Sequence, residues 1–464
     1  MNVTTAMAVA LLLGQTGADG AATPEAPAAQ PTLPADATGP VITLDEALRV
    51  AGERNLELQA LQGQLDQAQE ITWKALSLYF PQVTLGASYT LQEELRQDVV
   101  FGVGPSTPVG GGVQAYDTIG QTSVVTQKDG LLAAQAEATQ TLVSARLFFA
   151  IRGARDAQRA AVLGLENGRR QVLFGVARAY YGVAALKEAT GVSERLLEIA
   201  RRQERDAQVR YNAGAIAKVG LIRAQIDRAR AEEDVRRARA QYLSAKVALA
   251  GLLARDTAFE VEPPPEPTLP ATELDPLVTQ AIEARPDVKA ARSQQQAEEE
   301  NRRAAWSRYL PDVQAFGQYQ WTNMDIPGRD SGAWYGGVRL QWTILDGFRR
   351  ESDIREANGR VAETRARAES AVVTVRTQVT QALLDLESLR SNAQKAKEQR
   401  DLATENLRLV DVAYRAGTAT AVEQADAVAQ LRNAEILLTT ERLNAQLAAL
   451  NVLNVIGSFN PRAH

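Results

Sequence analysis

The chain lacks most of the side chains on which enzyme and metal chemistry depends. It has no cysteine, one histidine (His464), and aromatic residues at only 5% of its 464 positions. Without cysteine, disulfides, thiolate zinc sites and cysteine nucleophiles are excluded. A single histidine cannot supply a histidine zinc motif, and a Ser-His-Asp triad is not expected. We therefore expect no enzyme, no cofactor and no metal site.

Two further shortages limit the partners of the chain. Lys and Arg number 51 against 56 Asp and Glu, a formal net charge of -5, so no general nucleic-acid surface is expected. No apolar run reaches the roughly 18 residues that a membrane-spanning helix needs. If the chain crosses a membrane, we expect it to do so with β-strands.

The N-terminal segment reads as export and leader sequence. Residues 7–13 form an apolar core followed by small residues, which resembles a secretory signal peptide over residues 1–22. No Lys or Arg precedes Arg49, so the basic segment that usually opens such a peptide is missing. Residues 23–42 are rich in Pro and Ala and predict a flexible leader.

The body of the chain is two tandem copies of one unit. Short motifs recur 230 positions apart in the earlier part of each copy and 203 positions apart in the later part. The matching pairs are Asn55-Leu56-Glu57-Leu58 with Arg285-Pro286-Asp287-Val288, Tyr79-Phe80-Pro81 with Tyr309-Leu310-Pro311, and Tyr211-Asn212-Ala213-Gly214 with Tyr414-Arg415-Ala416-Gly417. We assign residues 43–260 to the first repeat and 273–457 to the second, joined by a Pro-rich linker at 261–272. The first repeat carries extra residues, about 92–137, that read as a surface loop.

Each copy changes from a helical pattern to a strand pattern at a proline, Pro81 or Pro311. Apolar and polar residues then alternate with period two, which predicts a β-hairpin over about 83–147 in the first repeat and 313–343 in the second. In the first hairpin the second strand is expected at about 139–147. The two repeats therefore contribute four strands.

These strands suit a membrane barrel, because each has one apolar and one polar face and about the required length. Three tryptophans at strand ends resemble an interfacial girdle: Trp321, Trp334 and Trp342. The alternative is a pair of ordinary hairpins that cover a soluble core. Four strands cannot close a barrel, and open edges are not tolerated in lipid. We therefore expect three chains to pool their strands into a 12-stranded β-barrel.

Long helices are predicted around the Tyr-x-Ala-Gly turns. The ranges 44–80, 152–212 and 349–415 contain few helix breakers, and sixty residues of helix span about 90 Å. A return helix of roughly 35 residues follows each turn, and its apolar residues form two adjacent stripes with a 3.5-residue repeat. Two stripes favour two helical neighbours, as in a closed α-helical barrel. The predicted fold class is mixed α+β: a long helical barrel plus four strands per chain.

Taken in order, these motifs identify a family resemblance across residues 43–457. The chain resembles the TolC-like outer membrane efflux proteins through the repeated Leu-Asp helix starts, the Tyr-x-Pro strand starts, Leu345-Asp346-Gly347 and the two glycine turns. The resemblance implies a homotrimer in the cell outer membrane, with most of the chain in the periplasm. It also implies a passive exit duct of a tripartite efflux pump or type I secretion system. Its partners would be outer-membrane lipid, a periplasmic adaptor and an inner-membrane transporter.

The resemblance also assigns roles to residues at the turns. It places the periplasmic entrance at Glu423, Asp426 and Tyr414. The adaptor-contacting tips are Tyr211, Gly214, Gly220, Leu221 and Gly417. Some relatives lock the closed entrance with an aspartate and a basic residue, whereas Gly220 and Ala419 stand at those positions here. The lock is therefore not expected in its usual form.

One alternative function comes from another class of protein. A periplasmic coiled-coil structural or adaptor protein would also carry long Ala-rich helices, and would use its hairpins for docking. An adaptor normally has a lipoyl-like β-domain beside one helical hairpin, and no such segment is found. The nature of the exported substrate is not encoded in any motif.

Overall fold

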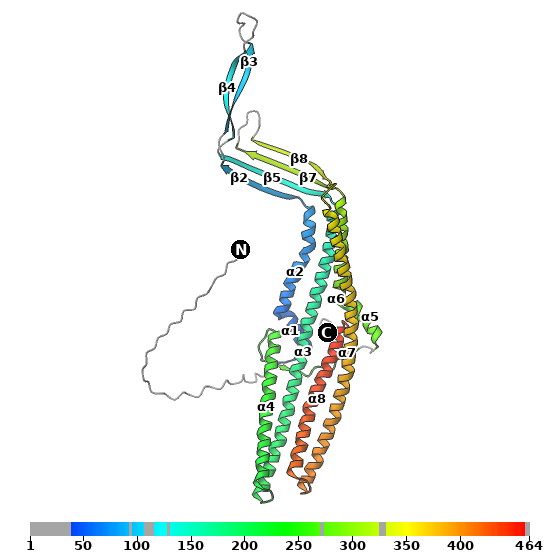
Figure 1. Ribbon diagram of the computed structural model, residues 1–464. Coiled ribbons are helices and arrows are strands. Elements are labelled where there is room, and N and C mark those ends of the chain that lie inside the picture. Colours follow the sequence, from blue (N-terminus) through cyan, green and yellow to red (C-terminus); the bar gives the residue numbers. More distant parts are fainter. Residues whose placement is uncertain are drawn as a thin grey trace, which may run out of the picture.

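The protein is an elongated molecule with strands at one end and helical turns at the other (Figure 1). This computed structural model describes residues 39–91, 95–105, 116–127, 130–269, 273–323 and 331–459, with backbone alone for 95–105 and 116–127. The predicted signal peptide, 1–22, and the leader up to residue 38 lie outside the described residues. Among the described helices, none combines the length and the apolar character needed to cross a membrane.

The two repeats place their helices in the same order. The first contains α1 (Leu44–Arg54), α2 (Leu56–Leu76), α3 (Ala145–Asn212) and α4 (Lys218–Leu252). The second contains α5 (Leu274–Ala284), α6 (Pro286–Trp306), α7 (Arg349–Arg415) and α8 (Ala421–Val455). A 3-10 turn precedes the strands in each repeat: η1 (Ser77–Tyr79) or η2 (Ser307–Tyr309). The predicted long helices and return helices are thus present.

The helix predicted over 44–80 is in fact two helices that break at Asn55. The backbone of Asn55 is extended, and its side-chain oxygen accepts hydrogen bonds from the amides of Glu57 and Leu58 at 2.9 and 3.1 Å. Its Nδ2 donates to the carbonyl oxygen of Leu252 at 2.7 Å, at the end of α4. These bonds outweigh the helical propensity of the segment. As a result, α2 continues the line of α4 alongside α3 (Figure 1).

One antiparallel sheet gathers the strands of both repeats. Its order is β2 (Gln82–Leu91), β5 (Gly130–Val143), β7 (Asp312–Thr322) and β8 (Gly332–Gln341). The hairpin of each repeat therefore lies beside the hairpin of the other, with β5 next to β7. The outer strands, β2 and β8, are left as the two edges of the sheet.

The second strand of the first hairpin differs from its predicted position. It begins at Gly130 and stops at Val143, so the expectation of strand up to 147 was wrong. The strand stops because Ser144 caps α3, its Oγ accepting a hydrogen bond from the amide of Leu147 at 3.2 Å. Leu147 is consequently a buried helical residue.

The extra residues of the first repeat form strands as well. Within the predicted loop of 92–137, β3 (Leu95–Pro105) pairs antiparallel with β4 (Tyr116–Gln127), and the pair projects beyond the main sheet (Figure 1). The other described residues of that range, 130–137, belong to β5. The expectation of a surface loop was therefore wrong for the described residues of this range, which all lie in strands. The glycines of the insert had indicated a surface loop, whereas Gly102 and Gly104 lie within β3.

Short elements cover one face of the long helices. Ala47 of α1 packs in one hydrophobic cluster with Tyr180 of α3, and Ala281 of α5 packs in another with Val379 of α7. A small parallel pair adjoins the first cluster: β1 (Val41–Ile42) and β6 (Glu260–Val261). A groove lined by Arg178, Asp385 and neighbouring residues of α3, α7 and α8 receives no residue from these short elements. The layer of long helices thus has one covered and one bare face.

Candidate functional site at the helical tips

Both helical hairpins turn at a glycine with a positive φ. Gly214 follows α3 with φ 69°, and Gly417 follows α7 with φ 78°. The amide of Gly214 donates to the carbonyl of Tyr211, and the amide of Gly417 donates to that of Tyr414, at 2.9 and 3.2 Å. In each turn the next amide reaches the carbonyl five positions earlier. This is the Schellman arrangement, which needs glycine because a Cβ is strained at this φ.

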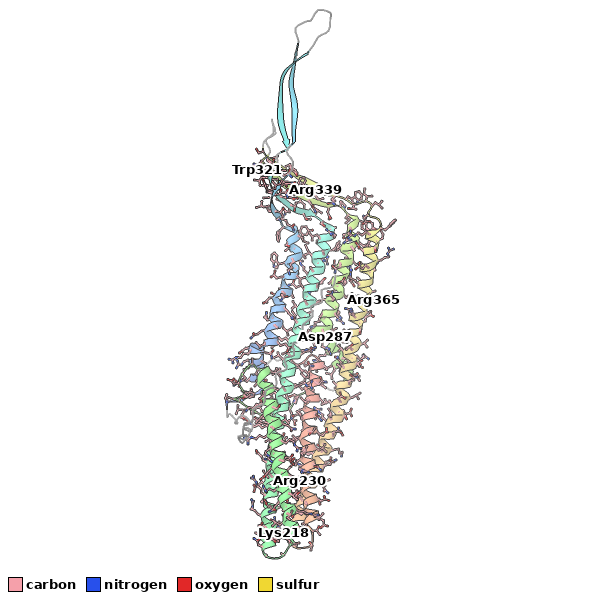
Figure 2. The ribbon with its side chains drawn as sticks, turned by 60° about the vertical axis from the view of Figure 1, so that its left-hand side comes forward. Lys218, Arg230, Asp287, Trp321, Arg339 and Arg365 are labelled. Carbon is pink, nitrogen blue, oxygen red and sulfur yellow. The ribbon has the colours of Figure 1, made fainter. Side chains whose placement is uncertain are left out.

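The first tip offers only part of its predicted contact set to a partner. Tyr211 is 37% exposed, whereas Leu221 is buried inside the hairpin at 7%. Gly220 lies in the first turn of α4, where an added Cβ would meet Ile216 Cδ1 at 3.3 Å. Lys218 opens α4 at the far end of the molecule (Figure 2). Of the predicted set, Tyr211 therefore offers an exposed side chain, and Leu221 shapes the turn from within.

At the second tip, Glu423 caps its own helix. Its Oε2 accepts hydrogen bonds from the amide and hydroxyl of Thr420 at 2.6 and 2.9 Å, and its amide donates to the Thr420 hydroxyl at 3.2 Å. This reciprocal capping box opens α8. The Thr420 amide and hydroxyl hold the pKa of Glu423 below its usual range, so the carboxylate stays charged.

Asp426 follows Glu423 at the next turn of α8 and is also exposed. Residues three apart in a helix share one side, so both carboxylates lie on the same side of the second tip. Nearby, Nε2 of Gln424 donates to Asp411 of α7 at 2.8 Å, which joins the two helices of this hairpin. Within the described part of the chain, no group of His, Cys, Asp and Glu is placed to hold a metal ion.

A contact that the sequence did not reveal joins the two tips. The guanidinium carbon of Arg210 lies 4.4 Å from the centroid of the Tyr414 ring, and its Nη1 donates to the Tyr414 carbonyl at 3.4 Å. The contact combines a cation–π interaction with a hydrogen bond. Gly220 and Ala419 carry no side chain able to form the lock of some relatives. The one available signal was that Arg210 stands where the second repeat has Ala413.

The opposite end of the molecule carries aromatic and basic side chains on the sheet. Figure 2 shows Trp321 and Arg339 there, far from Lys218 at the tip. The guanidinium carbon of Arg339 on β8 lies 4.7 Å from the ring centroid of Phe316 on β7. Trp334 is 80% exposed, and the Nε1 of Trp342 donates to the carbonyl of Tyr309 at 3.1 Å. The alternation predicted for these strands therefore leaves large apolar side chains without a partner in one chain.

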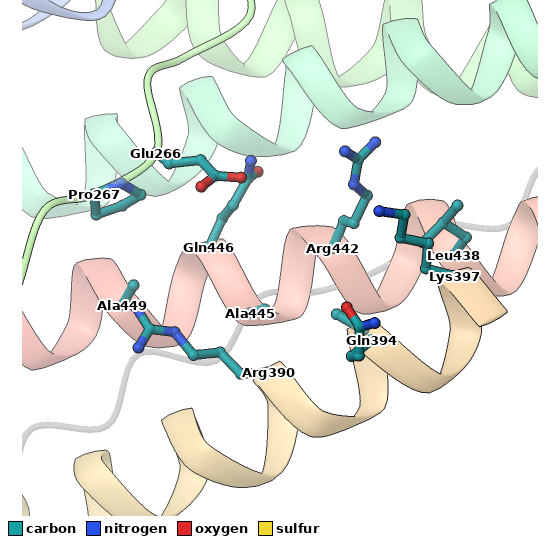
Figure 3. A pocket seen from close by; sticks show the side chains of 11 residues that line it. Glu266, Pro267, Arg390, Gln394, Lys397, Leu438, Arg442, Ala445, Gln446 and Ala449 are labelled. Atoms are coloured by element: carbon teal, nitrogen blue, oxygen red, sulfur yellow. The ribbon is translucent and has the colours of Figure 1, made fainter.

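A groove on the covered side of the helices lies between the linker, α7 and α8. Glu266 and Pro267 form its linker wall, and Arg390, Lys397 and Arg442 line the helical side of a space of about 230 Å³ (Figure 3). Arg442 also reaches Glu188 of α3 at 3.5 Å. Three cations and one carboxylate make this outer groove basic.

Comparison with known proteins identifies the chain. A family model described as outer membrane efflux protein matches residues 47–255 and 277–458. The chain belongs to the outer membrane efflux protein family. No curated protein matches it.

Solved structures with the same fold come from several bacteria. A membrane protein of Pseudomonas aeruginosa is 19% identical, with a TM-score of 0.72 over 89% of this chain and 93% of that one. The outer membrane protein VceC of Vibrio cholerae is 18% identical, with a TM-score of 0.70 over 89% and 96%. The MtrE outer membrane channel of Neisseria gonorrhoeae is 20% identical, with a TM-score of 0.68 over 89% and 88%.

Family membership decides between the functions that the sequence left open. Outer membrane efflux proteins are channels rather than enzymes, so this chain is an outer-membrane efflux channel. The predicted fold class, of long helices with a small sheet, is confirmed by the same findings. The alternative of a periplasmic structural or adaptor protein receives no support.

Proposed function

We propose that three copies of this efflux protein assemble head to tail into one closed duct. The observation that carries the proposal is that one chain has two different open edges along its whole length. β2, α2 and α4 form one edge, whereas β8 and α7 form the other (Figure 1). Two unlike surfaces on opposite edges build a ring when the rotation closes. Four strands from each of three chains supply the 12-stranded β-barrel.

The bare face of the helices lines the duct in this arrangement. The short elements α1, α5, β1 and β6 lie on one face, and a narrow duct has no room for them inside. The groove with Arg178 and Asp385 therefore faces the interior, and the basic groove under the linker faces the outside. The barrel end sits in outer-membrane lipid, and the helices extend into the periplasm.

The tips form the periplasmic entrance. Three copies each of Glu423 and Asp426 around a narrow mouth attract cations and repel anions. The capping bonds from Thr420 keep Glu423 charged. Tyr414, held by Arg210, joins the two hairpins of each chain at the same level.

A periplasmic adaptor contacts the outermost turns and links them to an inner-membrane transporter. The contact surface is the two glycine turns, with Tyr211, Gly214, Gly220 and Gly417 at their ends. Leu221 supports this surface from beneath, since it is buried in the hairpin. Together with the transporter, the duct serves as a passive exit for efflux or type I secretion.

Assembly is tested by the native mass of the protein extracted from outer membranes in detergent. The chain has a mass of 50.2 kDa before any leader is removed. A species near three chains supports the pooled barrel. A soluble single chain or dimer, absent from membranes, overturns the proposal.

The entrance is tested by single-channel conductance with Glu423→Gln and Asp426→Asn. Glutamine keeps the capping box while it removes the charge. We expect the double variant to lose much of its preference for cations. Glu435→Gln, further along α8, is a control that removes one charge per chain away from the entrance. An unchanged cation preference in the double variant rules out the acidic rings.

A further inference from the structure

The chain contains an internal interface between its repeats, where β5 and α3 meet β7 and α6. We infer that this interface recurs between neighbouring copies, where β8 and α7 of one copy meet β2 and α2 of the next. The inference rests on the proposed ring and adds which residues meet across it. It follows from the tandem repeat, because each half of the internal interface has a counterpart on an open edge.

The register of the sheet fixes which positions are counterparts. Gln82 pairs with Thr139 in the first hairpin, and Asp312 pairs with Gln341 in the second. First strands therefore correspond at an offset of 230 and second strands at 202, so the first hairpin is 28 residues longer. The long helices correspond at an offset of 203, as their glycine turns show.

Comparison of β5 with its counterpart β8 shows that β8, on the open edge, lacks a pairing strand at its end. β5 continues past Thr139 as far as Val143 because β7 pairs with it there, with Val143 opposite Val313. The counterpart β8 stops at Gln341, where its partner β7 begins. In the part of the chain that the structure describes, no strand pairs with the residues that follow, and Leu345 is 79% exposed. In the ring, β2 of the next copy pairs with these residues and places Val83 opposite Leu345.

The helices carry a matching pair of charges. Inside the chain, Arg152 of α3 lies 3.5 Å from Glu300 of α6, whose side chain is only 8% exposed. The counterparts are Arg355 on α7 and Glu70 on α2. Both are exposed, and neither makes an ion pair within the described residues, although the charge of Arg355 also acts on Glu351, one turn back on the same helix. Arg355 of one copy therefore pairs with Glu70 of the next copy.

One position distinguishes the two interfaces. At Gly153, an added Cβ would lie 2.8 Å from Asn301 Oδ1 and 3.2 Å from the Ala297 carbonyl, so α3 and α6 approach closely there. The counterpart of Gly153 is Glu356, which forms an ion pair with Arg360. The helices of neighbouring copies must therefore lie further apart at this level. The contact between copies is the looser version of the contact within one chain.

The absence of cysteine makes the strand register directly testable. Val83→Cys with Leu345→Cys places thiols at directly opposed positions, which in antiparallel strands have Cα atoms about 5 Å apart and suit a disulfide. In the full chain in outer membranes, oxidation should yield covalent dimers and trimers on non-reducing gels. Each single variant, and Leu91→Cys with Leu345→Cys, should stay monomeric on the same gels.

A reference pair separates failure of this inference from failure of the ring. Tyr89→Cys with Val338→Cys corresponds to Tyr319 opposite Ala136 and reports pairing along the middle of the edges. If this pair cross-links and Val83→Cys with Leu345→Cys does not, the ring stands and the inferred register is wrong. If neither pair cross-links and the native mass is one chain, the ring itself fails.

The ion pair is tested by charge reversal. Arg355→Glu and Glu70→Arg should each weaken trimer association about two- to fivefold per contact, the range for an exposed ion pair. The double variant should recover most of the trimer seen in detergent. Arg390→Glu, on the same helix but in the outer groove of Figure 3, is the matched control and should have no effect. A double variant no better than the single ones overturns the pairing.

Discussion

In each repeat the return helix meets the helix that leads to the strands, and the two repeats bond this meeting point with different side chains. We call the first joint the place where α4 ends and α2 begins, and the second joint the place where α8 ends and α6 begins. In the first joint, Asn55 alone bonds both helix ends, with the Leu252 carbonyl on one side and the amides of Glu57 and Leu58 on the other. It is neutral and buried. One small side chain thus bonds the ends of two helices.

In the second joint an ion pair takes over this role. Nε and Nη2 of Arg285 donate to Asp287 at 3.0 and 2.6 Å, and Nη1 donates to Gln378 at 2.6 Å and to the Val455 carbonyl at 3.4 Å. Asp287 also accepts from the amide of Val288 at 3.0 Å. A second arginine, Arg170, donates to the Asn454 carbonyl at 2.9 Å. Figure 2 places Asp287 midway along the molecule.

The two joints hold the same place in their repeats, since Asn55 and Arg285 stand 230 positions apart, but the side chains that bond them differ. Pro286 opens α6 and has no amide hydrogen, so fewer donors need a partner there than after Asn55. An ion pair at the second joint places a charge in the interior, and that charge destabilises the fold if its partner is lost. The two joints should therefore respond differently to mutation and to acid.

The largest effect is expected at the second joint. Asp287→Ala leaves the guanidinium of Arg285, whose side chain is 8% exposed, without its carboxylate. We expect a loss of about 3 kcal/mol, at the low end for a broken buried pair because Asp287 is a third exposed. Thermal unfolding of the detergent-solubilised protein measures it, with the exposed Asp275→Ala as control. A loss below about 1 kcal/mol would show that the ion pair does not hold this joint.

The first joint should be less sensitive. Asn55→Ala removes the cap of α2 and leaves the Leu252 carbonyl without its donor, for an expected loss of about 1–2 kcal/mol. The same unfolding assay applies, with the exposed Gln59→Ala as its control. If Asn55→Ala lowers the free energy of unfolding as much as Asp287→Ala does, the neutral joint is not the less sensitive of the two.

The two joints should also differ in how their contribution to stability depends on pH. Burial alone would raise the pKa of Asp287, but the hydrogen bonds and charge of Arg285 outweigh it and lower that pKa. Its contribution to the free energy of unfolding is therefore complete above the unfolded pKa of about 4 and is lost as pH falls through the lower folded value.

The measurement for this pH effect is unfolding from pH 7 to pH 3. The difference between the unmodified protein and Asp287→Asn should shrink below about pH 4. The cost of Asn55→Ala should stay constant, because Asn55 does not titrate. A pH-dependent cost for Asn55→Ala would contradict the assignment of acid sensitivity to the ion pair.

The smallest effect concerns the tips. Thr420 and Glu423 form a capping box at the second tip, whereas Ala217 and Gly220 occupy the corresponding positions of the first and provide no side-chain cap. Ala217→Thr with Gly220→Glu should stabilise the start of α4 by about 0.5–1 kcal/mol. Slower amide hydrogen exchange in its first turn measures this, and Thr420→Ala should produce the reverse change in α8. Unchanged exchange in both variants would mean that the caps do not control tip stability.

Several elements could be predicted because their signal is local. The glycine turns at Gly214 and Gly417 follow from a residue that tolerates positive φ, and the strands follow from alternation after a proline. The break at Asn55 was missed because the helical pattern continues through it, and one of the bonds that stabilise the break is made to Leu252, 197 residues away. Arg210 was missed for the same reason, since its partner Tyr414 lies in the other repeat.

The amino-acid sequence by itself determined the tandem repeat, the helical and strand periods, the two turns and the family, because each depends on neighbours within a few residues or on the comparison of one copy with the other. Only the tertiary structure decided where β5 ends, which edges stay open and how the joints are bonded. These features depend on contacts between segments far apart in the chain. Short-range patterns determine what a segment is, whereas its ends and its partners depend on packing energies that arise only when distant segments meet.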